Sequence, residues 1–195
     1  MNHWLPFLGY VLVTEFTPGP NNISSMSNAS RYGFAASSRY RLGIYFGFFV
    51  IQTLAALFSA VLTGVIPAVK PYMLALGAAY ILWMAWKTIT SRSSDGDGDA
   101  PARDNTFLSG VLLQFVNVKV ILFAITTMSV YAVPYSTSPV FLLAFGAVMA
   151  TFAFASINCW AAFGAVFSRV LRRHERAVNV VMALLLVWCA VALYL

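Results

Sequence analysis

Apolar residues fall in six long runs along this chain, and short polar stretches separate the runs. A helix needs about 20 apolar residues to cross a bilayer core. Each run therefore predicts one membrane span, and the chain is expected to be an all-α integral membrane protein with six transmembrane helices. The predicted spans run from Trp4 to Ser30, Leu42 to Ile66, Tyr72 to Ile89, Phe107 to Tyr131, Val140 to Phe167 and Val178 to Leu195.

The connections between these spans carry most of the positive charge, and they carry it on one side. Connections one, three and five, together with Lys87, contain ten Lys and Arg residues, whereas the opposite side contains only Lys70. Loops rich in Lys and Arg remain in the cytoplasm, so both termini are expected to face away from it. The predicted connections are 31–41, 67–71, 90–106, 132–139 and 168–177.

The composition agrees with a membrane protein and narrows the expected partners. Apolar residues make up 61% of the chain, charged residues make up 9%, and the mean hydropathy is +0.80. Soluble domains carry about 25% charged residues. Because the basic residues behind the net charge of +6 lie mainly in short loops, no nucleic-acid partner is expected. Cys159 and Cys189 lie in predicted spans and are expected to pack as small apolar residues.

The longest polar stretch, residues 91–106, divides a single transmembrane domain into halves of about 1–90 and 107–195. Its alternating Asp residues resemble a calcium-binding loop. Such a loop needs Gly and Glu where this chain has Ala100 and Thr106. The stretch is therefore predicted to be a flexible linker.

The two halves contain a weak internal repeat. A shift of 99 residues aligns Phe16 with Phe115 and Phe46-Gly47 with Phe145-Gly146. Because each half has three spans, the halves would cross the membrane in opposite senses. Two inverted three-helix repeats are a common plan of secondary transporters, whose substrate sites lie where the discontinuous helices of the repeats meet.

A Phe-Thr-Pro-Gly-Pro-Asn-Asn sequence that ends at Asn22 interrupts the first predicted span. Pro18, Gly19 and Pro20 remove amide donors and disfavour a continuous helix. A membrane tolerates the freed backbone groups only where protein or a water-filled cavity satisfies them. The pattern predicts a substrate site at this break, with Asn21 and Asn22 binding polar groups of the substrate.

The repeat places Gln114, Asn117 and Lys119 of the fourth span opposite this break. We expect these residues to supply the matching surface from the second half, with Lys119 as the partner of a substrate carboxylate. Gln114 and Asn117 are three residues apart and share a helix face, whereas Lys119 points elsewhere if the helix is regular.

Two ionisable residues, Glu15 and Lys119, lie near the middle of predicted spans. At 1.5 Å per residue, Glu15 is roughly 16 Å and Lys119 roughly 18 Å from the start of its span. In one interpretation Lys119 extends to the headgroups and Glu15 is a protonated structural residue. In the other, the two approach each other or share a hydrated cavity, and Glu15 is the candidate proton carrier.

Other polar residues also have two interpretations. Asn21, Ser24, Ser25 and Asn28 follow i, i+3, i+4, i+7 spacing, which predicts one face of a helix. That face either lines a hydrated route or makes interhelical hydrogen bonds. Asn158, in the fifth span, is either a pathway residue or a structural one.

Gly43 and Gly47 have the small-xxx-small spacing that allows close helix approach, and packing within the chain is favoured over dimerisation. His3 and His174 have no second histidine at ligand spacing. No metal site and no cofactor are therefore expected.

Three motifs together resemble the LysE/RhtB family of amino-acid exporters, and the similarity extends along essentially the whole chain. The Asn117-Val118-Lys119 sequence is similar to the branch of that family that exports cysteine and O-acetylserine, whereas many members have Asn-Pro-Lys. Glu15 departs from that branch, which carries a small residue at this place, so the resemblance implies no role for Glu15. The three motifs are Thr17 to Asn22, Ser30 to Phe34 and Phe115 to Lys119.

The resemblance implies six helices in a bacterial inner membrane, outward movement of small neutral amino acids, proton coupling and a capacity to form homodimers. It predicts a secondary active exporter that works by alternating access and has no catalytic residues. Two alternatives remain. A cation or metal exporter would need clustered carboxylate or thiolate ligands, and a small integral-membrane enzyme would need a clustered nucleophile and base.

Overall fold

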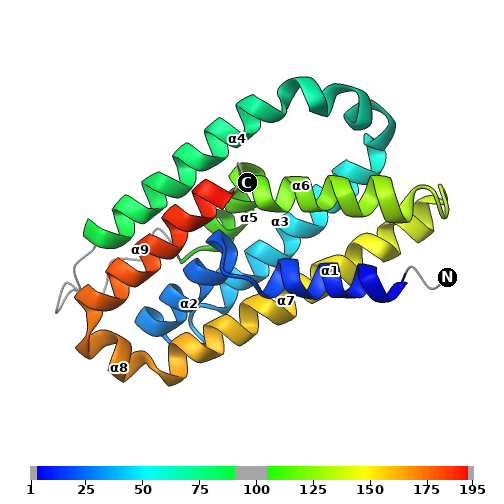
Figure 1. Cartoon of the computed structure of the whole chain (residues 1–195). Coiled ribbons are helices and arrows are strands. Elements are labelled where there is room, and N and C mark those ends of the chain that lie inside the picture. Colours follow the sequence, from blue (N-terminus) through cyan, green and yellow to red (C-terminus); the bar gives the residue numbers. More distant parts are fainter. Residues whose placement is uncertain (1–3, 91–104, 193–195) are drawn as a thin grey trace.

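The structure is a computed structural model that describes residues 4–90 and 105–192. Each regular element in these ranges is a helix (Figure 1), which confirms the all-α class. The predicted linker lies outside the described residues, except for Asn105 and Thr106. The helices are α1 (Trp4–Phe16), α2 (Pro20–Tyr32), α3 (Ser38–Leu57), α4 (Ser59–Thr90), α5 (Phe107–Val116), α6 (Val118–Thr126), the π-helix η1 (Thr127–Ala132), α7 (Pro139–Val166), α8 (Ser168–Arg173) and α9 (Glu175–Ala192).

The predicted break in the first span is present, and the fourth predicted span contains a second break. α1 ends at Phe16, and α2 begins at Pro20, where the fixed φ of proline suits the first helical position. In the second half, α5 ends before Asn117, and the helices on either side of this residue are bent by 67°. Each half of the chain therefore contributes one discontinuous helix.

Helix length and composition support a membrane protein. Within the described ranges, α3 and α7 are each long and apolar enough to cross a membrane, and the bent pair from α5 to η1 can form a third span. Shorter apolar helices cover Leu5–Phe16, Leu74–Thr90 and Arg176–Val191. The arrangement of six spans in inverted repeats remains a prediction.

Two predicted connections are helical, and one of them, 67–71, is wrong as a connection. Residues 67–71 lie inside α4, and the chain turns at Phe58 instead, where the Phe58 N–H donates to the Leu54 carbonyl. Helices of membrane proteins tolerate proline because neighbouring groups and local adjustments satisfy the freed backbone. Residues 168–177 form α8 and the start of α9.

The closest helix contacts join elements of opposite halves, namely α2 with α7, α3 with α5, and α4 with α9. Glycines allow two of these contacts. A Cβ atom on Gly43 would overlap the Phe107 carbonyl, and one on Gly164 would overlap the Met26 carbonyl. Gly47 likewise faces Val111 of α5. The Gly43-xxx-Gly47 motif therefore packs within the chain, as predicted.

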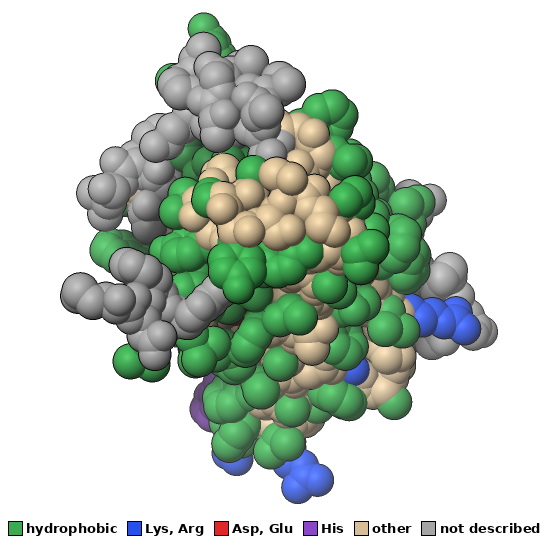
Figure 2. Space-filling view, turned by 90° about the vertical axis from the view of Figure 1, so that its right-hand side faces the viewer, with side chains coloured by type: hydrophobic (Ala, Val, Ile, Leu, Met, Phe, Trp, Pro, Cys, Tyr) green, Lys and Arg blue, Asp and Glu red, His purple; other side chains and the backbone are tan. Residues whose placement is uncertain are grey.

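The interior and the outer surface are both apolar. One buried cluster joins α1, α3, α6 and α7 through residues such as Val11, Phe48, Phe123 and Ala150. Large hydrophobic side chains also cover much of the outside, and in Figure 2 Lys and Arg lie mainly at the margin of the described surface in view. An apolar exterior with peripheral cations is suited to a lipid environment.

Candidate functional site

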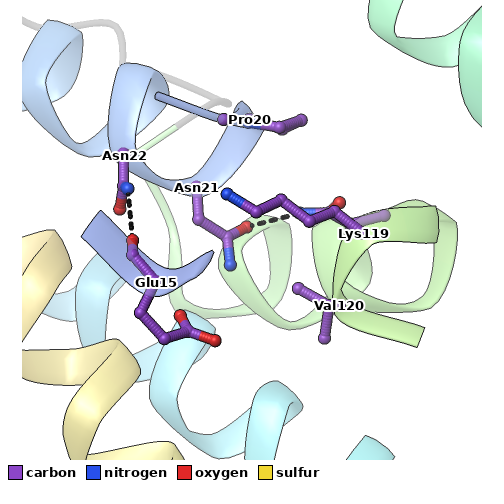
Figure 3. Close-up of a pocket in the computed structure, with 8 residues that line it drawn as sticks. Glu15, Pro20, Asn21, Asn22, Lys119 and Val120 are labelled. Carbon is purple, nitrogen blue, oxygen red and sulfur yellow. Dashed lines mark hydrogen bonds between the residues drawn. The ribbon is translucent and has the colours of Figure 1, made fainter. Parts of the chain in front are cut away.

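The two helix breaks meet around one pocket (Figure 3). It contains about 280 Å³ of free space, including its open mouth. Both halves of the chain line it, and most of the lining residues lie at or beside a break. The first half contributes Glu15, Gly19, Pro20, Asn21 and Asn22, and the second half contributes Asn117, Lys119 and Val120.

Side-chain amides connect the two breaks directly. The Asn21 amide nitrogen donates to Gln114 Oε1 at 2.9 Å, and Gln114 Nε2 donates back to Asn21 Oδ1 at 3.0 Å. Asn117 Nδ2 donates to the same Asn21 oxygen at 3.0 Å. Gln114 is fully buried and Asn117 is 1% exposed. A buried polar group needs such partners, so this network fixes the position of α2 against α5.

One atom of this network has no partner. Within the described part of the chain, nothing donates to Asn117 Oδ1, although the atom is buried. An unpaired buried acceptor costs about 1–3 kcal/mol. The break in the second half therefore contains a buried acceptor that lacks a donor among the described residues.

Side chains also satisfy the carbonyl groups freed at the end of α1, which we call the α1 carbonyl end (Glu15, Phe16, Thr17 and Pro18). Asn22 Nδ2 donates to the carbonyls of Glu15 at 2.7 Å and Thr17 at 2.9 Å. The other donors come from α7 and α9: Ser156 to Glu15, Trp160 to Phe16 and Cys189 to Pro18. The break is therefore an ordered structure held by several helices.

Lys119 contacts this carbonyl end from the second half. Its Nζ atom donates to the Thr17 carbonyl at 3.3 Å and to Thr17 Oγ1 at 3.2 Å. A Cβ atom on Gly19 would lie 3.2 Å from Nζ. The stem of Lys119 therefore passes over the glycine of the break.

Glu15 and Lys119 line the same pocket without direct contact. Among the described residues, neither forms an ion pair with a distance of 4.0 Å or less. Figure 3 shows the Glu15 carboxylate directed away from the Lys119 amine. Glu15 and Lys119 therefore share a pocket. Among the described residues, the Lys119 ammonium hydrogen-bonds only to the two neutral oxygens of Thr17.

The helix ends around the pocket have complementary polarity. α2 begins after Gly19 and α6 begins after Asn117, and in both cases no side chain within the described residues caps the first turn. Such helix starts expose amide donors and the positive end of the helix dipole. The end of α1 presents carbonyl groups of opposite polarity. The pocket is therefore bordered by helix ends of both polarities.

The predicted site residues are mostly together. The break at Asn117 makes this span irregular, so Lys119 lines the pocket with Asn117; the prediction for a regular helix does not apply. Pro18 and Gln114 do not line the pocket: Pro18 directly precedes Gly19 of the lining, and Gln114 bonds to Asn21 of the lining.

Asn158 lies in a different cluster. Its Oδ1 accepts from Arg41 Nε at 3.0 Å, and its Nδ2 donates to the Phe154 carbonyl. Arg41 also donates to Ser37 and lies over the Phe34 ring. The structure does not bring Asn158 to the pocket.

The polar face of α2 makes interhelical hydrogen bonds. Asn21 bonds to Gln114, and Ser24 accepts from the Tyr40 hydroxyl at 2.9 Å. Ser25 is fully buried, and its hydroxyl has no partner among the described residues. Packing therefore accounts for part of this face.

Sequence reasoning missed three residues that hold the break: Ser156, Trp160 and Cys189. Ser156 and Trp160 are four residues apart, so they share a face of α7. That polar spacing in an apolar helix was an available signal. Cys189 was predicted only to pack, and no pattern distinguishes it from Cys159, which is exposed.

Comparisons with known proteins agree with this geometry. The family described as "LysE type translocator" matches residues 12–195, which is most of the chain. The chain belongs to the LysE family. The predicted family resemblance is thereby confirmed, and a family of translocators fits a transporter better than an enzyme.

Curated relatives of this LysE-family protein carry a more specific name. Proteins named "Cysteine/O-acetylserine efflux protein" from Escherichia coli (strain K12) and Shigella sonnei (strain Ss046) are each 38% identical over 188 residues. The alignments cover 96% of this chain and 95% of each relative. No solved structure matches the chain.

Proposed function

We propose that this LysE-family protein is a secondary active exporter of small neutral amino acids, such as cysteine or O-acetylserine, from the bacterial cytoplasm. The observation that supports this proposal most directly is the pocket where two helix breaks from opposite halves meet. Transporters of several folds place their substrate sites at such paired breaks. The names of the curated relatives support the substrate class.

The chemistry of the pocket suits the carboxylate of an amino acid. Lys119 provides an ammonium group, and the starts of α2 and α6 expose amide donors. Charge-assisted hydrogen bonds are about twice as strong as neutral ones. A substrate carboxylate would therefore lie between Lys119 and the amides near Asn21 and Asn22.

The coupling ion is proposed to be the proton, with Glu15 as its carrier. Glu15 is the acidic residue of the pocket lining, and it lies in an apolar helix. Intramembrane carboxyl groups commonly act in proton relays. Protonation of Glu15 would change the charge of the pocket and so favour one access state over the other.

The proposed topology has six spans in two inverted repeats and both termini on the periplasmic side of the inner membrane. The carboxyl ends of α2 and α4 and the helix α8 lie toward one end of the molecule (Figure 1), and the start of α1 lies toward the other. The first group contains Arg31, Lys87 and Arg169. This distribution of charge supports the proposed orientation.

Counterflow in proteoliposomes tests the proposal. Vesicles containing the purified protein and loaded with unlabelled cysteine or O-acetylserine should accumulate the labelled form, and Asn21→Ala should abolish this accumulation. Vesicles with Cys159→Ala, a change on an exposed face of α7, serve as the matched control. Uptake of labelled metal ions in place of every amino acid tested would contradict the proposal and favour a metal exporter.

A further inference from the structure

Among the described residues, the Lys119 ammonium forms no ion pair within 4.0 Å, although the Glu15 carboxyl lines the same pocket. Within the described part of the chain, this ammonium donates hydrogen bonds to the Thr17 carbonyl and the Thr17 hydroxyl, and both oxygens are neutral. A cation at membrane depth is costly unless other groups stabilise it. Lys119 is therefore held where an anion that entered the pocket would attract it strongly.

The Thr17 oxygens belong to an exposed residue beside the pocket lining, and they form a good place for an ammonium group. They lie just past the end of α1, where the helix dipole is negative and favours cations. The Thr17 hydroxyl donates its own proton toward the Val13 and Thr14 carbonyls, so its lone pairs face outward as acceptors. The Thr17 carbonyl keeps a second donor, Asn22 Nδ2, when Lys119 leaves. The place thus remains structured without Lys119.

We propose that the Thr17 oxygens bind the α-ammonium group of the substrate, and that Lys119 occupies this place until the substrate arrives. This inference rests on the proposed function. On binding, the substrate carboxylate draws the Lys119 ammonium away from Thr17, and the substrate ammonium takes the vacated hydrogen bonds. Each ammonium group then has partners: Lys119 gains a carboxylate, and Thr17 keeps one cation.

The exchange determines which molecules the site accepts. An amine without a carboxylate would have to displace Lys119 while giving it no anion. An acid without an amine would release Lys119 and leave the Thr17 oxygens without a cation. The site therefore prefers α-amino acids over amines without a carboxylate and over acids without an amine. This preference does not depend on the side chain of the amino acid.

Three thiol compounds that differ only in these groups test the inference: cysteine, cysteamine and 3-mercaptopropionate. Their affinities are measured by calorimetry on the full chain in lipid nanodiscs under reducing conditions. The unmodified protein should bind cysteine at least about tenfold more tightly than the other two. Lys119→Gln should lose about tenfold to a hundredfold in cysteine affinity and gain affinity for cysteamine, because the Thr17 oxygens are then vacant. Lys87→Gln, an exposed lysine on α4, is the matched control.

A second variant keeps the test decisive if Lys119→Gln does not fold. Thr17→Val preserves the shape of the side chain and removes the hydroxyl acceptor. Because Lys119 and the cysteine ammonium lose the same hydrogen bond, cysteine binding should change little. 3-Mercaptopropionate should bind up to about tenfold more tightly, because it then releases Lys119 from one hydrogen bond fewer.

The outcomes separate the two proposals. Unchanged 3-mercaptopropionate affinity in Thr17→Val, or an unchanged preference for cysteine over cysteamine in Lys119→Gln, would overturn the exchange while leaving the exporter proposal intact. An unmodified protein that binds neither cysteine nor O-acetylserine would overturn the exporter proposal, and the exchange with it.

Discussion

At the scale of single residues, the pocket depends on a few buried amides. Asn21 uses its donor and its acceptor to bind two residues of the other half, Gln114 and Asn117. Removing one partner of a buried pair is costly, whereas replacing both partners by apolar groups of similar shape is often nearly neutral. The stability and the function of this network can therefore be separated by mutation.

Asn21→Leu should destabilise the protein by roughly 1–3 kcal/mol, because it leaves buried donors and acceptors of Gln114 and Asn117 unpaired. The double variant Asn21→Leu/Gln114→Met should regain part of this loss but should not regain transport. Thermal unfolding in detergent and counterflow measure the two effects. Equal stability of the single and double variants would show that the amide pair is not a coupled unit.

Gly19 provides a second test at this scale. Its φ of −166° is extended, so alanine fits the backbone, but the added Cβ would lie 3.2 Å from Lys119 Nζ. Gly19→Ala should therefore keep the thermal midpoint and lower the rate of counterflow by about tenfold, since it displaces the Lys119 amine. A variant with a normal rate would show that the position of this amine is not critical.

At the scale of helices, glycine determines how closely the two halves approach. α3 and α5 touch through backbone atoms, because side chains are missing at Gly43 and Gly110. Such close packing is a main source of helix association in membranes, where the hydrophobic effect does not drive helices together.

Gly110→Ala should separate α3 from α5 and lower stability by roughly 1–3 kcal/mol, because the new Cβ would overlap the Tyr40 carbonyl. Gly9→Ala is the matched control on α1, since nothing lies within 4 Å of its added Cβ. Thermal unfolding of both variants in detergent decides the matter. A Gly110→Ala protein as stable as Gly9→Ala would mean that α5 can move away at little cost.

At the scale of the whole molecule, the distribution of charge makes a prediction about orientation. An alkaline phosphatase fused after Leu195 should be active, because this enzyme folds outside the cytoplasm. A green fluorescent protein fused at the same place should not fluoresce. The physical reason is the retention of Lys-rich and Arg-rich loops in the cytoplasm. The opposite pair of results would place the C-terminus in the cytoplasm and reverse the proposed direction of the spans.

Much of this architecture could be predicted because it depends on local chemistry. Prolines beside Gly19 broke the first span as expected, and the repeat aligned this break with the stretch from Phe115 to Lys119, where the second break lies. The helix through residues 67–71 could not be predicted from the local sequence, because a membrane changes the usual effect of proline.

Side-chain partners at the site were less predictable, because they depend on tertiary contacts. Asn158 and Ser156 are two residues apart on the same helix, yet Asn158 bonds to Arg41 and Ser156 to the break. Cys189 and Cys159 have the same apolar setting in the sequence and different partners in the fold. Such differences follow from which helix lies opposite, and a single sequence does not contain that information.

The pairing of helices from opposite halves has a consequence for biogenesis. The ribosome delivers the first half before the second, so Gly43 and the Met26 carbonyl enter the bilayer before the residues that cover them. The Met26 carbonyl is covered only after Gly164 has been synthesised. The helices of the first half therefore form an intermediate whose packing surfaces at Gly43 and Met26 are uncovered. The native contacts form only when the helices of the second half have inserted.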